Sequence, residues 1–329
     1  MITSGVERPL SVAVVGVGEM GRNHARCLAS MKGVDLVAVV DPDADRCNEA
    51  AATFECVPLT SITDLPPVDA AIVAVPSTSH AEIGCALMDR GVHCLVEKPL
   101  ALDRIQAQLL VEAADSAKVV LQVGHIERFN PAVRQLKELL DGEPILVADT
   151  RRMSAFSRRV TDIDVVMDLM VHDLDIVLFL MGDDIDSIEA RAVSGPSGPD
   201  HVTALLSFQD DRLASLTASR ITQNQIRQLE VTTKDRFFTV DYPNQELLIF
   251  RQGRIGVDGS DASEGRYALD VDTKRVFVRR TEPLVAELQH FLGVVRGTHD
   301  NEVDGRGALR ALDLVWAIQG RLQGSADGS

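Results

Sequence analysis

The stretch that decides the fold is Leu10–Gly21, with the sequence LSVAVVGVGEMG. Its first half is an apolar, β-branched run without polar alternation, which is typical of a strand buried on both faces of a parallel sheet. Its second half carries the pattern Gly16-x-Gly18-x-x-Gly21. In this pattern the first glycine allows a tight turn, the second lets a pyrophosphate approach the main chain, and the third lets the next helix pack on the strand. A helix beginning near Glu19 would direct its N–H groups at that pyrophosphate, so the stretch predicts a dinucleotide site.

Two later features support a dinucleotide site. Helically spaced apolar residues follow the glycines and end at Gly33, a typical C-cap. A second apolar strand, Val34–Val40, then ends in Asp41, at the separation expected for the acid that binds the adenosine ribose. The alternative for Asp41 is the N-cap of a helix that begins at Pro42, and one carboxylate can do both. Its charge would repel a 2′-phosphate, and the nearest arginine is Arg46, so the sequence favours NAD over NADP.

The composition limits the class of protein. The chain has 329 residues, enough for about two domains, and 45% hydrophobic and 25% charged residues are ordinary values for a globular protein. The net charge of −16 argues against nucleic acid or an anionic membrane surface as the main partner. No apolar run is long enough to span a bilayer, and the N-terminus has no signal-peptide core. The five cysteines show no zinc-site spacing, so we expect reduced cysteines, no metal and a cytoplasmic location.

Apolar strand candidates and helical segments alternate through the first part of the chain. After Val34–Val40 the strand candidates are Asp69–Val75, His93–Val96 and Val119–Val123, and helical segments separate them. This alternation is the signature of a doubly wound parallel sheet, an α/β fold. We therefore expect an NAD-binding Rossmann domain at residues 1–125.

The pattern changes after this domain. Helices are expected at Asn130–Leu140 and Val165–Met181, and short strands then follow one another, several with alternating polar and apolar residues. Consecutive short strands favour a large, mainly antiparallel open sheet with one solvated or subunit-covered face. We therefore place a second α/β domain, for substrate binding and oligomerisation, at residues 126–329. Its closing helices, near Pro283–Arg296 and Gly305–Leu322, could instead pack back on the first domain.

Candidate catalytic residues must reach the carboxyl ends of the parallel strands. Glu97-Lys98-Pro99 directly follows the strand His93–Val96. A lysine held between a carboxylate and a fixed turn can polarise a substrate hydroxyl or carbonyl. The alternative is a surface lysine in a loop. The segment Pro76–His80 follows the preceding strand and would face the nicotinamide half of the cofactor.

A polar stripe lies on the otherwise apolar helix Val165–Met181. Asp168 and His172 are one turn apart, and Asp175 is three residues further on, so one face of the helix would carry all three. A carboxylate one turn from an imidazole can fix its tautomer and raise its basicity, which suits a general base for an alcohol. The alternative is a buried His–Asp pair with a structural purpose.

Arginines gather in this acidic protein near the predicted cleft. They are Arg151, Arg152, Arg158 and Arg159, with Arg128, Arg220 and Arg227 as further candidates. Arginine forks suit phosphate or carboxylate groups, so as a cluster they indicate an anionic substrate. The alternative is that most of these arginines, each taken alone, lie in a solvated loop and bind no ligand. Asn130, which precedes Pro131, is most simply a helix N-cap.

Together these residues resemble the glucose–fructose oxidoreductase/inositol dehydrogenase (GFO/IDH/MocA) family over nearly the whole chain. The resemblance rests on Gly16-x-Gly18-x-Met20-Gly21, Asp41, the Pro76–His80 loop, Glu97-Lys98-Pro99 and Asp168-x-x-x-His172. It implies an NAD(P)-dependent sugar or polyol oxidoreductase with a Rossmann domain and an α/β domain, whose open sheet builds homodimers or homotetramers. It also implies that Lys98, Asp168 and His172 are the catalytic set.

A narrower resemblance is to UDP-N-acetylglucosamine 3-dehydrogenase-like members of the family. It rests on Gly124–Pro131 (GHIERFNP), Asp168–Asp173 (DLMVHD) and Ala218-Ser219-Arg220. Such enzymes oxidise the 3-hydroxyl of a nucleotide sugar before an aminotransferase acts. The arginine cluster fits the pyrophosphate of UDP.

The predicted site has three parts. The catalytic residues are Lys98, His172 and Asp168. The residues expected to bind NAD are Gly16, Gly18, Glu19, Met20, Gly21, Asp41, Pro76, Ser77, His80, Glu97 and Lys98. The residues expected to contact the substrate are Arg128, Asn130, Arg151, Asp168 and His172.

The expected activity is NAD-dependent oxidation of a secondary hydroxyl of a sugar, most simply the 3-hydroxyl of a UDP-N-acetylhexosamine. His172 would take the hydroxyl proton, and Lys98 would stabilise the developing negative charge. Three alternatives stay open: a dehydrogenase for inositol or a free sugar, a reductase of a carbonyl or imine such as a tetrapyrrole, and a non-enzymatic, NAD-holding regulatory protein. The complete set of Lys98, Asp168 and His172 argues for an alcohol. Substrate affinity that weakens with salt would distinguish a pyrophosphate ligand from a polyol.

Overall fold

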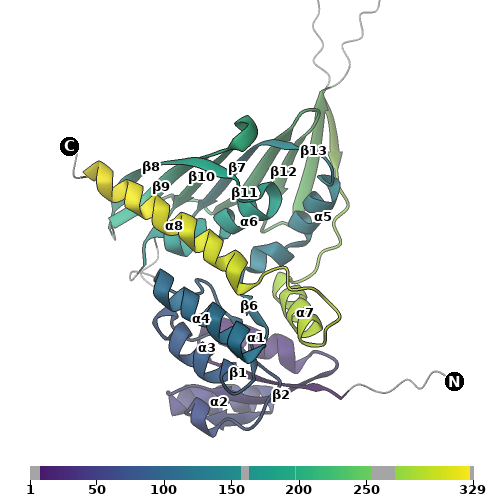
Figure 1. Cartoon of the computed structure of the whole chain (residues 1–329). Coiled ribbons are helices and arrows are strands. Elements are labelled where there is room, and N and C mark those ends of the chain that lie inside the picture. Colours follow the sequence, from purple (N-terminus) through teal and green to yellow (C-terminus); the bar gives the residue numbers. More distant parts are fainter. Residues whose placement is uncertain (1–7, 157–162, 197, 253–270, 327–329) are drawn as a thin grey trace, which may run out of the picture. The chain divides into compact units, whose positions relative to one another are not determined.

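The structure, a computed structural model, describes residues 8–156, 163–196, 198–252 and 271–326. The chain divides into two compact units (Figure 1). The first unit comprises Met1–Phe129 and Glu282–Asp313, and the second comprises Asn130–Thr281 and Leu314–Ser329. The chain therefore leaves the first unit after Phe129 and returns to it for one late segment.

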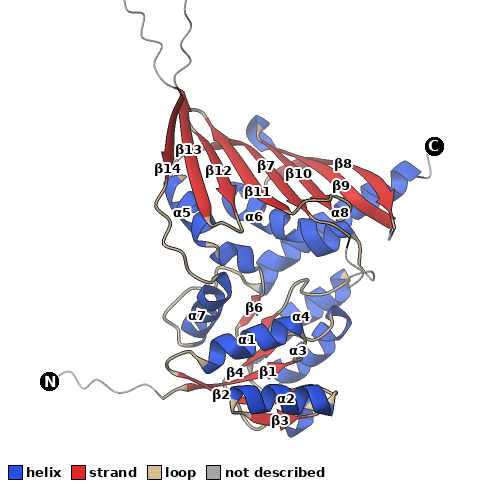
Figure 2. Cartoon of the chain, turned by 180° about the vertical axis from the view of Figure 1, so that it is seen from behind, coloured by secondary structure: helices blue, strands red, loops and turns tan. Residues whose placement is uncertain are grey.

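The first unit contains a six-stranded parallel sheet with the strand order β3-β2-β1-β4-β5-β6. The strands are β1 (Leu10–Val15), β2 (Val34–Val40), β3 (Val57–Leu59), β4 (Ala70–Val73), β5 (His93–Val96) and β6 (Leu121–Val123). The helices that follow them are α1 (Glu19–Ala29), α2 (Ala44–Phe54), α3 (His80–Met88) and α4 (Arg104–Ala117) (Figure 2). Because the strand order runs outward from β1 in both directions, the predicted doubly wound α/β fold is confirmed.

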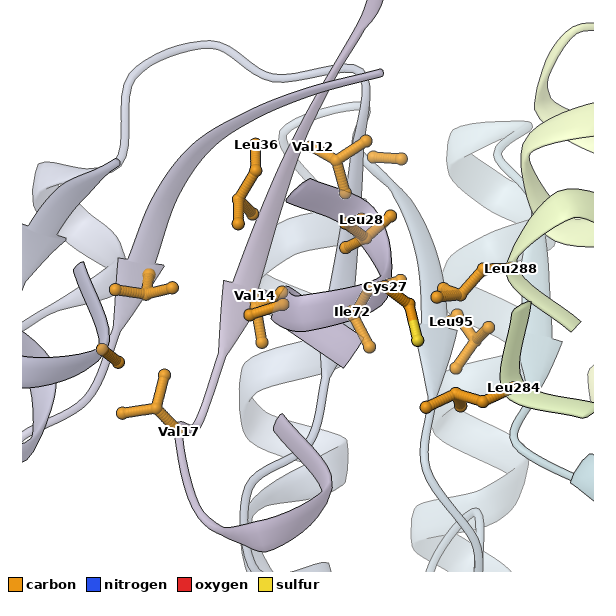
Figure 3. Close-up of a cluster of buried hydrophobic side chains, with 14 of the residues drawn as sticks. Val12, Val14, Val17, Cys27, Leu28, Leu36, Ile72, Leu95, Leu284 and Leu288 are labelled. Carbon is orange, nitrogen blue, oxygen red and sulfur yellow. The ribbon is translucent and has the colours of Figure 1, made fainter. Parts of the chain in front are cut away.

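Helix α7 (Pro283–Val295) belongs to the core of the first unit although it lies far from it in the sequence. Its Leu284 and Leu288 are buried in one apolar cluster with side chains of β1, α1 and β5, and Figure 3 shows them beside Cys27 and Leu95. Burying one leucine side chain stabilises a fold by about 1.5–3 kcal/mol. These contacts therefore explain why the chain returns to this unit.

The second unit contains an eight-stranded sheet with the order β14-β13-β12-β11-β7-β10-β9-β8. The strands are β7 (Ile145–Met153), β8 (Ile185–Gly195), β9 (Gly198–Phe208), β10 (Leu213–Ser219), β11 (Ile226–Thr233), β12 (Phe237–Asp241), β13 (Glu246–Gln252) and β14 (Val271–Arg275). Only β7 and β10 pair in parallel among the described strands of this sheet. The predicted mainly antiparallel sheet is confirmed.

Helices α5 (Pro131–Leu139) and α6 (Val171–Met181) pack on one face of this sheet (Figure 2). Strand β9 shows the consequence, because Ala204 and Leu206 are fully buried whereas Leu205 between them is 37% exposed. Alternating side chains point to opposite faces of a strand. The alternation in the sequence therefore does mark one covered face and one open face.

The chain closes with helix α8 (Gly305–Ala326), which extends beyond the predicted end at Leu322. None of the helices in the described ranges combines the length and the apolar character that crossing a bilayer requires.

Candidate active site

The glycine loop after β1 presents bare main chain. Gly16 has a φ of +88°, and a Cβ there would lie 2.5 Å from the carbonyl oxygen of Ala74. A Cβ on Gly21 would lie only 1.8 Å from the carbonyl oxygen of Gly16. Gly18 is exposed, and a Cβ there would meet none of the described atoms within 4 Å. The loop is therefore closely packed on its inner side and open on its outer side.

Helix α1 begins at this open side. Its N-cap is Gly18, and no described side chain caps the helix there. The first N–H groups of a helix have no partner within the helix and form a ready anion site. Glu19 and Met20, which were predicted to contact the cofactor, are exposed in this first turn. The arrangement fits the diphosphate of a dinucleotide.

Asp41 lies directly after β2, and the glycine loop holds its carboxylate. Oδ2 accepts a hydrogen bond from the Val17 N–H at 2.9 Å, and Oδ1 accepts one from the Arg46 guanidinium at 2.8 Å. Burial alone would raise the pKa of Asp41, but these hydrogen bonds outweigh it and hold the pKa below its ordinary value. The alternative of a helix cap is wrong, because α2 begins at Ala44 with Asp43 as its N-cap.

The segment after β4 divides into accessible and buried residues. Pro76 is exposed and Ser77 is half-buried, so both can be reached from solvent. His80 is buried, with Nδ1 2.9 Å from the carbonyl oxygen of Pro99 and Nε2 3.0 Å from that of Val75. A neutral imidazole carries one N–H, so His80 can donate to only one of these two carbonyl oxygens at a time. His80 is packed against the turn at Pro99, and its predicted contact with the cofactor stays a prediction.

Lys98 stands in a firmly anchored turn at the carboxyl end of β5. Its main-chain N–H donates to Oε2 of Glu97 at 3.2 Å, and Oε1 of Glu97 lies 2.7 Å from Nε2 of His24. The next peptide bond, to Pro99, is cis. Lys98 itself is half-buried between two buried residues. An unconstrained surface lysine, the alternative considered above, does not fit this turn.

The contact between His24 and Glu97 was not predicted from the sequence. His24 is fully buried on α1 beside Ala25 and Leu28. A polar ring on the buried face of a helix needs a partner, and that is the signal that could have singled it out. Its partner lies 73 positions away, so spacing could not identify it. Glu97 is therefore directed at His24, which does not support the predicted contact between its carboxylate and the cofactor.

Asp168 and His172 are both partly exposed in the second unit, but the helix that carries them is irregular. Val166–Met170 forms a π-helical turn, and α6 (Val171–Met181) follows directly. The first N–H of α6 reaches the carbonyl oxygen at the start of that turn. The single α-helix predicted over Val165–Met181 is therefore wrong in its first part. Such π-turns are rare in proteins as a whole, and those that occur lie frequently at functional sites.

Arg220 is buried beside Asp168. Its Nη1 lies 3.9 Å from Oδ2 of Asp168 and donates to the carbonyl oxygen of Ile163 at 3.0 Å. Its Nη2 lies 3.1 Å from Oδ1 of Asp200, which is fully buried. Arg220 therefore belongs to an internal ion-pair cluster that holds the π-helical turn, and its guanidinium does not stand on the surface as a phosphate ligand would.

A second buried ion pair fixes α6 to the sheet. Arg152 of β7 binds Asp173 of α6 through two contacts of 3.0 Å each, and both side chains are buried. Two parallel N–H to oxygen bonds are the strong form of this pair. Asp175 is also buried, whereas Asp168 and His172 are partly exposed, so the predicted polar stripe is not uniformly accessible.

Arg151, a predicted substrate contact, lies on the other face of β7. Because successive side chains of a strand alternate, it points away from the face on which Arg152 meets α6. There it is bound to Gln228 and Glu230 of the neighbouring strand β11 at 3.0 and 2.8 Å. The structure thus does not bring Arg151 to the face that carries His172.

The other predicted substrate residues are placed as follows. Asn130 is the N-cap of α5, because its Oδ1 accepts from the N–H of Ala132 at 3.1 Å, while its Nδ2 donates to the carbonyl oxygen of Tyr242 at 3.1 Å. The simpler interpretation of Asn130 is therefore confirmed. Arg128 is buried in a 3-10 turn, and Arg227 is exposed on β11. Arg158 and Arg159 lie outside the described residues.

Two family models match the chain. The first, described as an oxidoreductase family with an NAD-binding Rossmann fold, covers residues 10–125. The second, the GFO/IDH/MocA C-terminal domain, covers residues 146–236.

Three known proteins show the range of similarity. UDP-N-acetylglucosamine 3-dehydrogenase of Acidithiobacillus ferrooxidans is 33% identical over 312 residues, covering 94% of this chain and 96% of the relative. Its solved structure (GnnA) has a TM-score of 0.87, with 96% of this chain and 98% of that chain covered. Inositol 2-dehydrogenase of Rhodococcus jostii is 28% identical, covering 91% of this chain and 86% of the relative. The 3-ketoreductase KijD10 of Actinomadura kijaniata, solved with NADP, has a TM-score of 0.78 at 18% identity, covering 96% of this chain and 98% of that chain, which shows a shared fold.

Proposed function

Because the chain belongs to the GFO/IDH/MocA family of NAD-binding oxidoreductases, we propose that it oxidises a secondary hydroxyl of a sugar by hydride transfer to NAD. The proposed substrate is a UDP-N-acetylhexosamine, and the proposed position is its 3-hydroxyl. The observation that carries this proposal is the relative named UDP-N-acetylglucosamine 3-dehydrogenase, at 33% identity over 94% of the chain. A likeness over nearly the full length includes the residues of both units, not the nucleotide-binding part alone.

Lys98, Asp168 and His172 are the proposed catalytic residues. His172 takes the proton of the substrate hydroxyl, and Asp168, one turn away, orients its imidazole. The ammonium of Lys98 binds the hydroxyl oxygen and stabilises the negative charge that develops as the proton leaves. The nicotinamide of bound NAD supplies the hydride acceptor. The anchored turn at Lys98 and the partial exposure of His172 support these roles, because a catalytic group must be both fixed and accessible.

The proposed cofactor site consists of the glycine loop, the start of α1, Asp41 and the Pro76–Ser77 segment. NAD is proposed over NADP because the carboxylate of Asp41 suits a ribose 2′-hydroxyl and repels a 2′-phosphate. Arg46 is already paired with this carboxylate at 2.8 Å, so its charge is partly neutralised there. This pairing supports the preference for NAD.

The direct test is a screen of UDP-sugars for NADH formation, with an aminotransferase present to remove the ketone. We expect NADH with UDP-N-acetylglucosamine or a close relative of it, and much less with NADP as the oxidant. Removal of the ketone matters because the equilibrium of such an oxidation can favour the alcohol. If no UDP-sugar yields NADH in the presence of the aminotransferase, the proposed substrate is wrong.

An inositol or free-sugar dehydrogenase is the second candidate. The observation in its favour is the relative of Rhodococcus jostii named inositol 2-dehydrogenase, at 28% identity over 91% of the chain. The internal ion pairs of Arg220 and the placement of Arg151 add to it, because neither guanidinium supports the binding of a pyrophosphate. Salt separates the two candidates, since only a pyrophosphate substrate should bind more weakly as ionic strength rises.

The assembly and location follow from the same proposal. We propose a homodimer or homotetramer built through the open face of the second sheet, where Leu205 and Leu213 are each 37% exposed. Sedimentation of the purified protein tests this.

A cytoplasmic location is supported by the five cysteines, all of which are free thiols in the described residues.

A further inference from the structure

Three buried ionisable side chains interact in the first unit, and one of them precedes Lys98 in the sequence. Glu97 comes from the end of β5, His24 from α1 and Glu287 from α7. His24 and Glu287 are fully buried, and Glu97 is 9% exposed. The mechanism proposed above assigns no role to His24 or Glu287, and it uses Glu97 only as a main-chain anchor of Lys98. Burying charged groups is costly unless they are paired, so the cluster calls for an explanation.

The carboxylate of Glu97 is held on several sides. Nε2 of His24 lies 2.7 Å from Oε1, and the N–H of Lys98 donates to Oε2 at 3.2 Å. Gly124, after β6, closes a third side, because a Cβ there would lie 3.0 Å from Oε2 and 3.2 Å from Cα of Glu97. The carboxylate therefore has a fixed position directly under the main chain of Lys98.

The cluster holds its charge on Glu97. Burial alone would raise the pKa of Glu97, but the hydrogen bond and charge of His24 and the charge of Lys98 outweigh it and hold the pKa below its ordinary value. Glu287 behaves in the opposite way, because burial, and then the charge of Glu97, raise its pKa well above the ordinary value. Glu287 therefore keeps its proton, and Glu97 is the ionised carboxylate of the two.

Other titratable groups approach this cluster. His80, at the start of α3, interacts with the charge of Glu97 while its ring contacts the carbonyl oxygens of Pro99 and Val75. His290, one turn beyond Glu287 on α7, binds Oε1 of Gln122 through Nδ1 at 2.8 Å. These hydrogen-bond partners of the two histidines are main-chain carbonyl oxygens and an amide oxygen, whereas His24 contacts the carboxylate of Glu97 directly.

We propose that Glu97 is a positioning residue for Lys98, with its carboxylate fixed by His24 and Lys98 fixed in turn through its main-chain N–H and its charge. A negative charge at this fixed place favours the ammonium form of the lysine. It also restrains the base of the side chain, so that the ammonium is offered to a substrate oxygen in one position. The inference rests on the proposed function only in taking Lys98 as catalytic.

The test measures the titration of Lys98 and needs no substrate. The sequence contains six lysines, so reductive ¹³C-methylation gives a small set of NMR signals, and Lys98→Arg identifies the one from Lys98. In Glu97→Gln we expect the NMR titration of Lys98 to move to lower pH, because the shape is kept and the charge is lost. His24→Leu should move the titration in the same direction, since a buried carboxylate that loses one of its two donors takes up a proton more easily. His24→Gln retains a donor and should give a smaller shift.

Glu287→Gln is the matched control. It replaces a protonated acid by an amide of the same shape, so the titration of Lys98 should stay where it is. A fall as large as that in Glu97→Gln would place the negative charge on Glu287 and overturn the proposal. An unchanged Lys98 titration in Glu97→Gln would overturn it as well. Thermal unfolding checks that each variant is folded. If His24→Leu does not fold, the comparison of Glu97→Gln with Glu287→Gln is sufficient.

Kinetics provide a second readout. If the sugar oxidation is found, Glu97→Gln should move the basic limb of the pH profile of kcat/KM to lower pH and leave the KM for NAD unchanged. Combined with Lys98→Met, Glu97→Gln should cause no further loss of kcat, because it acts through the missing lysine. Losses that multiply in the double variant would contradict the proposal. An inactive wild-type protein with the expected NMR shifts would count against the proposed function alone.

Discussion

The two units hold their candidate functional groups by different means. In the first unit Asp41 and Lys98 follow the ends of parallel strands and are anchored largely through the main chain, to Val17 and Glu97. In the second unit the charged groups lie within a strand and a helix and are fixed by buried ion pairs, as Arg152 is with Asp173. From this difference we infer which property of the protein a substitution should change in each unit. In the first unit a substitution of Asp41 or Lys98 should affect ligands and catalysis, whereas in the second unit a substitution in these ion pairs should affect stability.

The largest effect expected from this contrast is in Lys98→Met. Because the lysine is proposed to stabilise the charge on the substrate oxygen, its loss should lower kcat by about 10²–10³-fold. The turn is held by main-chain contacts and by Glu97, so the melting temperature and the affinity for NADH should stay nearly the same. Steady-state kinetics, thermal unfolding and NADH titration provide the measurements.

Lys32→Met is the matched control for that variant. Lys32 is an exposed lysine of the same unit, and its replacement should change none of the three quantities. Normal turnover of Lys98→Met would remove Lys98 from the mechanism. A large fall in its melting temperature would show that the contrast between the units is wrong.

The second prediction compares two neighbouring residues of β7. Arg152→Met takes both guanidinium contacts from the buried carboxylate of Asp173, which should lower the free energy of unfolding by about 3–5 kcal/mol. Arg151→Met removes a pair with Glu230 whose side chains are 45% and 32% exposed, so the loss should stay within about 1 kcal/mol. Urea unfolding of both variants decides the matter. Equal losses would mean that the face of the strand does not determine the role of an arginine here.

The same contrast explains what could be predicted from the sequence. The glycine pattern and Asp41 predicted the first sheet correctly, because residues that follow parallel strands must gather at one edge. The arginines of β7 could not be placed, because a shift of one residue sends a side chain to the opposite face. The π-helical turn at Val166–Met170 was also missed, since apolar periodicity does not register the extra residue of a π-turn.

Contacts between distant segments were predicted only in part. The sequence leaves open that the closing helices pack back on the first domain, and α7 does join the core of the first unit. The contact of His24 with a partner 73 positions away was missed, because such pairing has no local signature. The predicted roles of Lys98, Asp168 and His172 stay predictions, and so does their joint action on one substrate.

The third prediction concerns Glu287. Although it lies in the first unit, its substitution should affect stability, as expected for the buried ion pairs of the second unit. Its pKa in the folded protein is raised well above the ordinary value by burial and then by the charge of Glu97. Its contribution to stability is therefore complete below its pKa in the unfolded chain, about 4.3, and is lost as pH rises through the folded pKa.

Glu287→Gln removes this titration. The variant should become more stable relative to the wild type as pH rises, by up to about 1.4 kcal/mol per pH unit between the two pKa values. Urea unfolding between about pH 4 and pH 8 measures the difference. Asp41 titrates with the opposite sign, because its pKa is lowered, and its contribution to stability is lost as pH falls through that pKa. A stability difference for Glu287→Gln that does not change with pH would show that Glu287 is ionised in the folded protein.

The smallest effect, and the sharpest comparison, concerns two arginines that each face an aspartate. The side chain of Arg46, opposite Asp41, is 44% exposed, whereas that of Arg220, opposite Asp200, is 4% exposed. Removing the acid should therefore leave Arg46 hydrated and able to meet a 2′-phosphate, whereas the buried guanidinium of Arg220 would lose the carboxylate that lies 3.1 Å from its Nη2.

Asp41→Ser should accordingly weaken NADH binding by about tenfold, improve NADPH binding, and change stability little. Asp200→Ser should lower the melting temperature and leave the ratio of the two affinities unchanged. Titration of each variant with both cofactors and thermal unfolding separate these results. Asp43→Ser is the control beside Asp41, because serine can still cap α2. An Asp41→Ser protein that keeps the wild-type ratio would show that its carboxylate does not select the cofactor, and the functional role assigned to the end of β2 would then be wrong.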